Sequence, residues 1–141
     1  MTLFEQIRAR YPADVPITVT GHSLGGGIAI QVSLEKPNVK AYVFNTSPRF
    51  RLRGTAPANR RLSIVEYGEF LKAGRLFGRE ANQTYISLNC TPGLNSIAQH
   101  SSRRLADCLT RLAAYREPGA RLSLVRNNIP APVGLPETPG R

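Results

Sequence analysis

The sequence has little of three things: cysteine, acidic residues and long apolar runs. Its 141 residues include only Cys90 and Cys108, which cannot by themselves build a disulfide framework or a four-ligand zinc site. No apolar run reaches the roughly 18 residues that a membrane-spanning helix needs. The N-terminus, MTLFEQIRARYP, mixes charges with apolar residues, unlike a secretory signal. We therefore expect no metal, no membrane span, and a cytoplasmic protein whose cysteines are reduced and packed as small apolar side chains.

The shortage of acids leaves a strongly basic chain. Nine acidic residues face nineteen basic ones, sixteen of them arginine, which gives a formal net charge of +10. The arginines are spread along the chain, which favours a solvated basic surface, with contact to anionic lipid head groups as the alternative. Nucleic acid is disfavoured because aromatic residues for base stacking are almost absent near the arginines. The densest arginine group consists of Arg49, Arg51, Arg53, Arg60 and Arg61.

Apolar patterning predicts strands that alternate with helices. Strands are expected at 16–20, 40–45, 61–66 and 83–89, and helices at 2–10, 24–35, 69–76 and 99–116. This alternation is typical of βαβ units and predicts an α/β fold with about four parallel strands and flanking helices. The last segment, 118–141, is rich in proline. We expect it to be an extended tail after a domain that spans 1–117.

Residues 17–29, ITVTGHSLGGGIA, contain the pattern G-x-S-x-G. A β-branched strand leads into Ser23 and an apolar helix follows it, which is the context of a nucleophile elbow. Gly21 and Gly25 are expected to remove Cβ atoms that would clash where strand and helix meet. The backbone N–H of Leu24 would then point at the site and stabilise an oxyanion. The alternative is a turn that serves packing or binds phosphate, but no Lys follows the glycines.

A nucleophilic serine needs a general base, and the chain has only two histidines. His22 also belongs to the elbow, but it adjoins Ser23 on a tight turn, so its side chain is expected to point away. His100 follows the fourth predicted strand and would lie at the carboxyl edge of the sheet, where Ser23 also lies. His100 is therefore the expected base.

The base needs an orienting carboxylate, which lies between the serine and the histidine in the chain order of α/β-hydrolases. Four acidic residues occupy that interval, and two of them, Glu35 and Glu80, fall at the opposite end of the sheet. Glu69 lies in the turn after the third predicted strand and is the favoured acid. Glu66, at the end of that strand, is the alternative.

These residues resemble the fungal-type (class 3) lipases of the α/β-hydrolase superfamily. The resemblance rests on Tyr11-Pro12 before the elbow strand, on GHSLGG at 21–26 and on FNTSPR at 44–49. It implies hydrolysis of carboxylic esters, of acylglycerols or phospholipids, through an acyl-enzyme and without a cofactor. The resemblance also implies a lipid or other ester as substrate, with Glu in a position where the family carries Asp.

Members of that family have several strands, and the loop with a second oxyanion donor, before the elbow. We therefore expect a partial α/β-hydrolase fold whose N-terminal strands are missing. The elbow strand would then be an exposed edge, prone to self-association or to pairing with a partner chain. The alternative function is a catalytically silent remnant, or an interaction module, that retains the fold.

Overall fold

A computed structural model describes residues 1–47, 56, 58–68, 83–90, 92–93, 95 and 97–135. Its centre is a sheet of four parallel strands in the order β1-β2-β3-β4. The strand bounds are Ile17–His22 for β1, Val39–Phe44 for β2, Arg61–Glu66 for β3 and Thr84–Leu88 for β4. The predicted α/β fold, a partial α/β-hydrolase sheet with flanking helices, is confirmed, while the helix expected at 69–76 lies outside the described residues.

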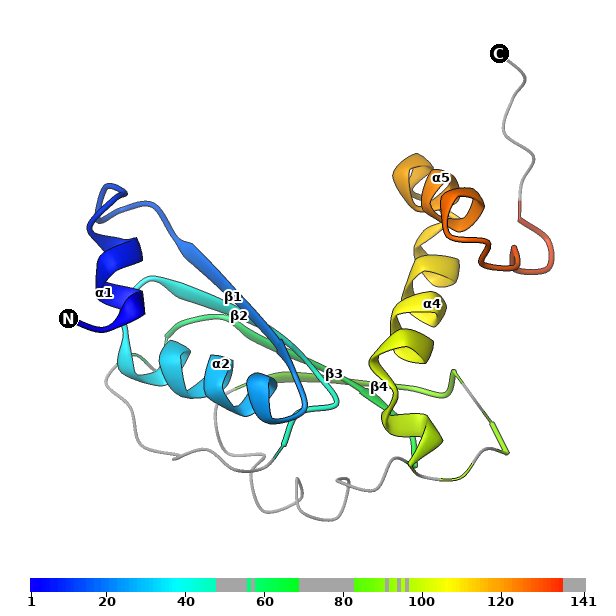
Figure 1. Ribbon diagram of the computed structural model, residues 1–141, viewed down its shortest axis with the longest axis horizontal. Helices are drawn as coiled ribbons and strands as arrows, with labels where there is room; N and C mark the ends of the chain where they lie inside the picture. The colour runs from blue at the N-terminus through cyan, green and yellow to red at the C-terminus, as the bar shows by residue number, and fades with distance from the viewer. Residues whose placement is uncertain are drawn as a thin grey trace.

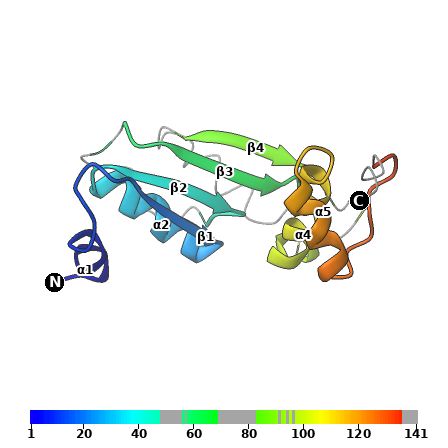
Figure 2. The ribbon, with the colours of Figure 1, turned by 90° about the horizontal axis from the view of Figure 1, so that it is seen from above.

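Helix α2 (Leu24–Glu35) covers one face of the sheet, as Figures 1 and 2 show. It packs on β1 and β2 because the inward residues of these strands are small or β-branched. Ile30 and Val43 are completely buried, and Val19 packs against them. The helix ends at Glu35 because Pro37 cannot continue it. This packing fixes where the N-terminus of α2, and with it the elbow, lies.

A buried arginine ties α2 to the sheet. Arg61, 3% exposed, donates through Nε to Ser33 Oγ at 2.7 Å and through Nη2 to the carbonyls of Ser33 and Ala56. Its Nη1 reaches the carbonyl of Asn59 at 3.0 Å. Burial lowers the pKa of this guanidinium. The four acceptors offset the free-energy cost of burying its charge. Arg61 is thus removed from the basic surface expected from the sequence. Arg60 is exposed, whereas Arg49, Arg51 and Arg53 lie outside the described residues.

The C-terminal part is more helical than expected. The short 3-10 helix η2 (Ala98–His100) leads into α4 (Ser102–Ala113), and α5 (Pro118–Arg126) packs against α4. The extended conformation predicted from residue 118 onward is therefore wrong for α5, because a proline in the first turn suits the start of a helix. Arg121 stabilises the junction by donating to the carbonyls of Ala114 and Tyr115.

The cysteines are also not as expected. Cys90, just after β4, and Cys108, on α4, form a disulfide with their Cα atoms 5.7 Å apart. The prediction of two reduced thiols is wrong because the pairing depends on α4 folding back to the end of β4, which local sequence does not encode. The bond attaches α4 covalently to the carboxyl end of the sheet, where the arrowheads of the strands point towards α4 and α5 (Figure 2).

Strand β1 lies at the edge of the sheet, as expected. Within the described ranges β2 is the strand that pairs with it. The short helix α1 (Leu3–Arg8) precedes β1 near the opposite end of the strands from α4 (Figure 1). On the sheet face away from α2, Tyr42 and Ile86 remain 43% and 40% exposed. No helix in the described part of the chain is long and apolar enough to cross a membrane.

Candidate active site

Ser23 lies between β1 and α2 in a backbone conformation that is rare for a residue with a side chain. Its φ is 53° and its ψ is −121°. Its N–H donates to the carbonyl of Phe44, and its carbonyl accepts from the amides of Gly27 and Ser47. Backbone bonds to β2, to α2 and to the segment after β2 therefore impose the positive φ. The strained turn expected at the elbow is present.

The elbow requires glycine at positions 21 and 26, whereas the sequence predicted positions 21 and 25. A Cβ on Gly21 would lie 2.3 Å from the carbonyl oxygen of Gly25, so α2 starts here only because Gly21 has no side chain. A Cβ on Gly26 would meet Thr46 Oγ1 at 2.9 Å. At Gly25 itself an added Cβ would meet nothing within 4 Å. The clash expected at Gly25 is wrong, because this residue faces outward on the first turn of α2.

His100, 77 residues further along the chain, reaches the serine. Its Nε2 lies 2.9 Å from Ser23 Oγ, within hydrogen-bond distance. The side chain of Asn95 accepts the N–H of Ala98 at the start of η2, and Ser101 Oγ accepts the N–H of Arg104 at the start of α4. The Asn95 bond fixes the turn before η2, and the Ser101 cap begins α4 directly after His100.

The second histidine of the chain points toward this site and not away from it. His22 Nε2 lies 2.9 Å from the backbone carbonyl of His100, and the two imidazole rings are 4.8 Å apart between centroids. The expectation that its side chain turns away is wrong: His22 is the last residue of β1, and its half-buried ring faces the segment that carries His100. Burial lowers the pKa of His22, the contact with the His100 carbonyl opposes this by raising it, and the charge of the His100 ring has a smaller lowering effect.

Of the two candidate acids, Glu66 is described and Glu69 lies outside the described residues. Glu66 is 2% exposed, and its Oε1 accepts the backbone N–H of Cys90 at 2.8 Å. This bond joins the end of β3 to the segment after β4. The turn that follows β3 runs close to the histidine segment, because a Cβ on Gly68 would lie 2.9 Å from Gln99 Oε1.

Asn45 is a residue whose role sequence reasoning missed. It is completely buried directly after β2, with a φ of 43°. Its Oδ1 accepts the N–H of Glu66 at 2.7 Å, and its Nδ2 donates to the carbonyl of Gln99 at 3.3 Å. One side chain thus joins the ends of β2 and β3 to the segment of His100. An Asn immediately after a buried strand, a residue that tolerates positive φ, was the available signal.

The N-terminus of α2 opens toward the same place. Ser23 occupies the N-cap position of α2, yet its side chain makes no capping hydrogen bond to the helix. The leading N–H groups of a helix lack partners within the helix, and the helix dipole favours negative charge beside them. Leu24, which supplies the first of these N–H groups, is 57% exposed. The position of this N–H at the start of α2 suits it to stabilise negative charge that develops beside Ser23.

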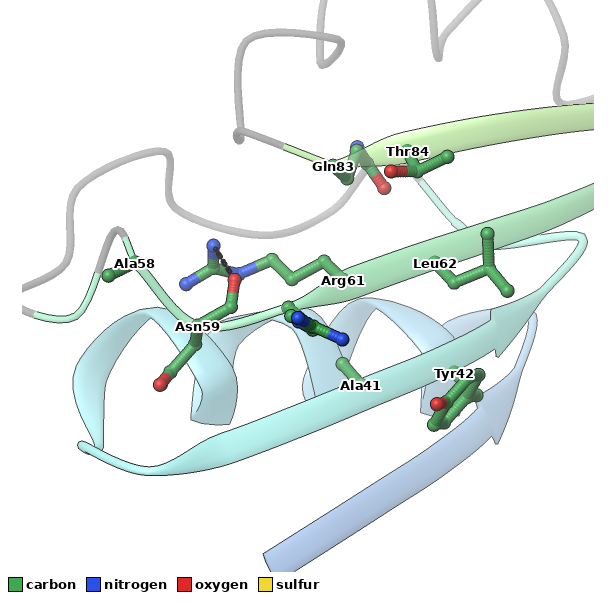
Figure 3. Close-up of a pocket in the computed structure, with 9 residues that line it drawn as sticks. Ala41, Tyr42, Ala58, Asn59, Arg61, Leu62, Gln83 and Thr84 are labelled. Atoms are coloured by element: carbon green, nitrogen blue, oxygen red, sulfur yellow. Dashed lines mark hydrogen bonds between the residues drawn. The ribbon is translucent and has the colours of Figure 1, made fainter. Parts of the chain in front are cut away.

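A cavity of about 570 Å³ lies elsewhere, at the opposite end of β2, β3 and β4 (Figure 3). Among its lining residues Arg61 already donates to Asn59, as the dashed line in Figure 3 marks. Neither Ser23 nor His100 lines this cavity, and the contact between these two side chains is what brings a nucleophile and a base together. The described residues contain no group of three His, Cys, Asp or Glu that could hold a metal ion.

Comparison with protein-family models matches residues 1–132 to the family described as serine aminopeptidase, S33. No curated protein and no solved structure matches the chain. The match supports the α/β-hydrolase superfamily, in agreement with the parallel sheet and the strained elbow, and it does not support the class 3 lipase family that the sequence resembles. The chain belongs to the serine aminopeptidase S33 family of the α/β-hydrolase superfamily.

Proposed function

We propose that the chain is a serine hydrolase that cleaves carboxylic esters through an acyl-enzyme. Ser23 Oγ attacks the ester carbonyl while His100 Nε2 accepts its proton, and His100 later returns the proton to the leaving alcohol. The N–H of Leu24 stabilises the oxyanion, and Gly21 and His22 belong to the elbow that presents the serine. Water then repeats the sequence on the acyl-enzyme and releases the acid.

The observation that carries this proposal is the 2.9 Å distance between Ser23 Oγ and His100 Nε2. A packing turn needs no histidine from 77 residues away beside its serine. Nor does it need a positive φ at the serine, which costs on the order of 1–3 kcal/mol. The residue with the strained backbone is also the one whose hydroxyl contacts His100, and this coincidence supports a nucleophile at Ser23.

We propose Glu69 as the carboxylate that orients His100. It directly follows Gly68, whose backbone adjoins Gln99, the neighbour of His100. Glu66 remains the alternative acid because it ends the same strand. The contact that favours Glu69 is the bond between Glu66 Oε1 and the Cys90 amide, because it commits one oxygen of Glu66 to the end of β4.

For the substrate, we propose lipid esters, acylglycerols or phospholipids. The resemblance to class 3 lipases supports this class, and the net charge of +10 favours anionic substrates and surfaces over a peptide with a protonated amino terminus. Removal of an amino-terminal residue from a peptide is the second candidate, because the family description names an aminopeptidase. A silent remnant or interaction module, which keeps the fold without turnover, is the third.

Turnover of two substrate series separates these candidates. We expect p-nitrophenyl acyl esters to be hydrolysed and aminoacyl p-nitroanilides to be left intact, with Ser23→Ala inactive on both. Preferred cleavage of the anilides would select the peptidase. Absence of turnover and of acylation, in a protein shown to be folded by circular dichroism, would select the silent remnant.

Two further expectations concern partners and compartment. Among the described residues β1 pairs with β2 on one side, and we propose that its other edge pairs with a strand of a second copy or of another chain. Light scattering of the isolated chain should then report an assembly larger than a monomer. The cytoplasmic location remains a prediction. The disulfide is the observation against it, since structural disulfides persist mainly in oxidising compartments. Thiol labelling of the protein taken directly from its own cells tests this point.

A further inference from the structure

The segment that carries His100 is bound to the sheet through two consecutive carbonyls. Asn45, at the end of β2, donates its Nδ2 to the carbonyl of Gln99 at 3.3 Å. His22, at the end of β1, lies with its Nε2 2.9 Å from the carbonyl of His100. Because η2 has only three residues, its own hydrogen bonds cannot fix the direction of the His100 ring. These side chains from neighbouring strands therefore define where this backbone lies.

We propose that His22 is a positioning residue for the general base, holding the backbone carbonyl of His100 so that the His100 ring stays at Ser23. The proposal rests on the proposed hydrolase function and extends it to a residue with no part in the proton transfer. A carbonyl oxygen can only accept, so His22 Nε2 must carry a proton.

The protonation of His22 fits this role. Its pKa is lowered, mainly by burial, which favours the neutral ring, and the carbonyl acceptor requires that the proton of this neutral ring lies on Nε2. During the reaction His100 becomes an imidazolium, with its ring centroid 4.8 Å from that of His22. A neutral His22 keeps its hydrogen bond without placing a second positive charge beside that imidazolium. The neutral Nε2–H form is thus the one that can position His100 throughout the cycle.

Two variants of equal length isolate the hydrogen bond. His22→Gln retains an N–H donor near the position of Nε2, whereas His22→Met has the same chain length without a donor. We expect His22→Met to lower kcat for a p-nitrophenyl ester by about 10- to 100-fold, because a displacement of about 1 Å at a reacting group can cost about 10²-fold. KM should change by less than about twofold, and His22→Gln should recover most of the loss. Circular dichroism of both variants verifies that they fold.

Normal kcat in a folded His22→Met would overturn the proposal. Equal losses in both variants would do so as well, because the donor would then not be the cause. A measurement independent of turnover is the ¹⁵N spectrum of the imidazoles. Wild type should show His22 protonated on Nε2, and the His100 ring signals should shift in His22→Met but not in His22→Gln. An unprotonated His22 Nε2 would refute the hydrogen bond to the His100 carbonyl. Lack of turnover in wild type would count against the proposed hydrolase, while the spectra would still decide the positioning role.

Discussion

The strain at Ser23 predicts that removing its Cβ stabilises the fold. Ser23→Ala and Ser23→Gly both lose the hydroxyl and its contact with His100 Nε2, so that loss cancels between them. Ser23→Ala retains the Cβ, and with it the backbone strain at a φ of 53°. Ser23→Gly has no Cβ and relieves that strain. Relief of a positive φ is worth about 1–3 kcal/mol. Glycine lowers the free energy of unfolding by about 0.5–1 kcal/mol relative to alanine, because it raises the conformational entropy of the unfolded chain.

The difference leaves Ser23→Gly more stable than Ser23→Ala by up to about 2.5 kcal/mol. At about 2–4 °C per kcal/mol for a chain near this size, the melting temperature of Ser23→Gly should exceed that of Ser23→Ala by up to roughly 10 °C. Urea titrations of both variants, fitted by linear extrapolation, measure the free energy of unfolding, and equal slopes show that both unfold to the same state.

Ala9→Gly supplies the matched control. Ala9 is exposed at the end of α1 with a φ of −64°, so glycine there should cost about 0.5–1 kcal/mol without relieving strain. Subtracting this value from the Ala-to-Gly difference at position 23 isolates the strain. If Ser23→Gly were less stable than Ser23→Ala by as much as Ala9→Gly lowers stability, Ser23 would store no strain and the argument for a built elbow would lose its energetic support.

Three further predictions test the surroundings of the site. Gly21→Ala should destabilise the fold by about 3 kcal/mol because its Cβ would overlap the Gly25 carbonyl, whereas Gly25→Ala should be neutral or stabilising by up to about 1 kcal/mol in thermal melts. Glu69→Gln should lower the esterase rate by about 10³–10⁴-fold and Glu66→Gln by less than tenfold, so a larger loss at Glu66 would reassign the acid. Cys108→Ser should cost about 3 kcal/mol in unfolding experiments, from a crosslink that spans 18 residues, and should make the melting temperature insensitive to reductant. A reductant-insensitive wild type would contradict the role given to the disulfide.

Local sequence predicts the sheet and the elbow well, for a physical reason. Strand and helix periodicity, Gly21 before the serine and Pro37 after α2 all act within a few residues of one another. The four strands and α2 therefore form within about two residues of their expected bounds, β1 running on to His22. The proximity of Ser23 and His100 was also predictable, because the carboxyl ends of parallel strands share one edge.

The contacts that depend on distant residues were not predictable. The orientation of His22 is set by a carbonyl 78 residues away. The disulfide needs α4 to lie over the end of β4, and the burial of Arg61 needs acceptors from α2. Each contact joins segments that are far apart in the chain and whose own patterns give no sign of it. Local reasoning therefore predicted a histidine turned away by its tight turn, free thiols and a surface arginine.

The most direct test of the central claim is acylation of Ser23 by a fluorophosphonate probe. A serine activated by His100 should react at its Oγ, and mass spectrometry of the labelled peptide should place the adduct on Ser23. Ser23→Ala should abolish the labelling, and His100→Ala should slow it by at least about 10²-fold. Labelling that persists unchanged in Ser23→Ala, or a folded wild type that does not label at all, would contradict the assignment of Ser23 as an activated nucleophile.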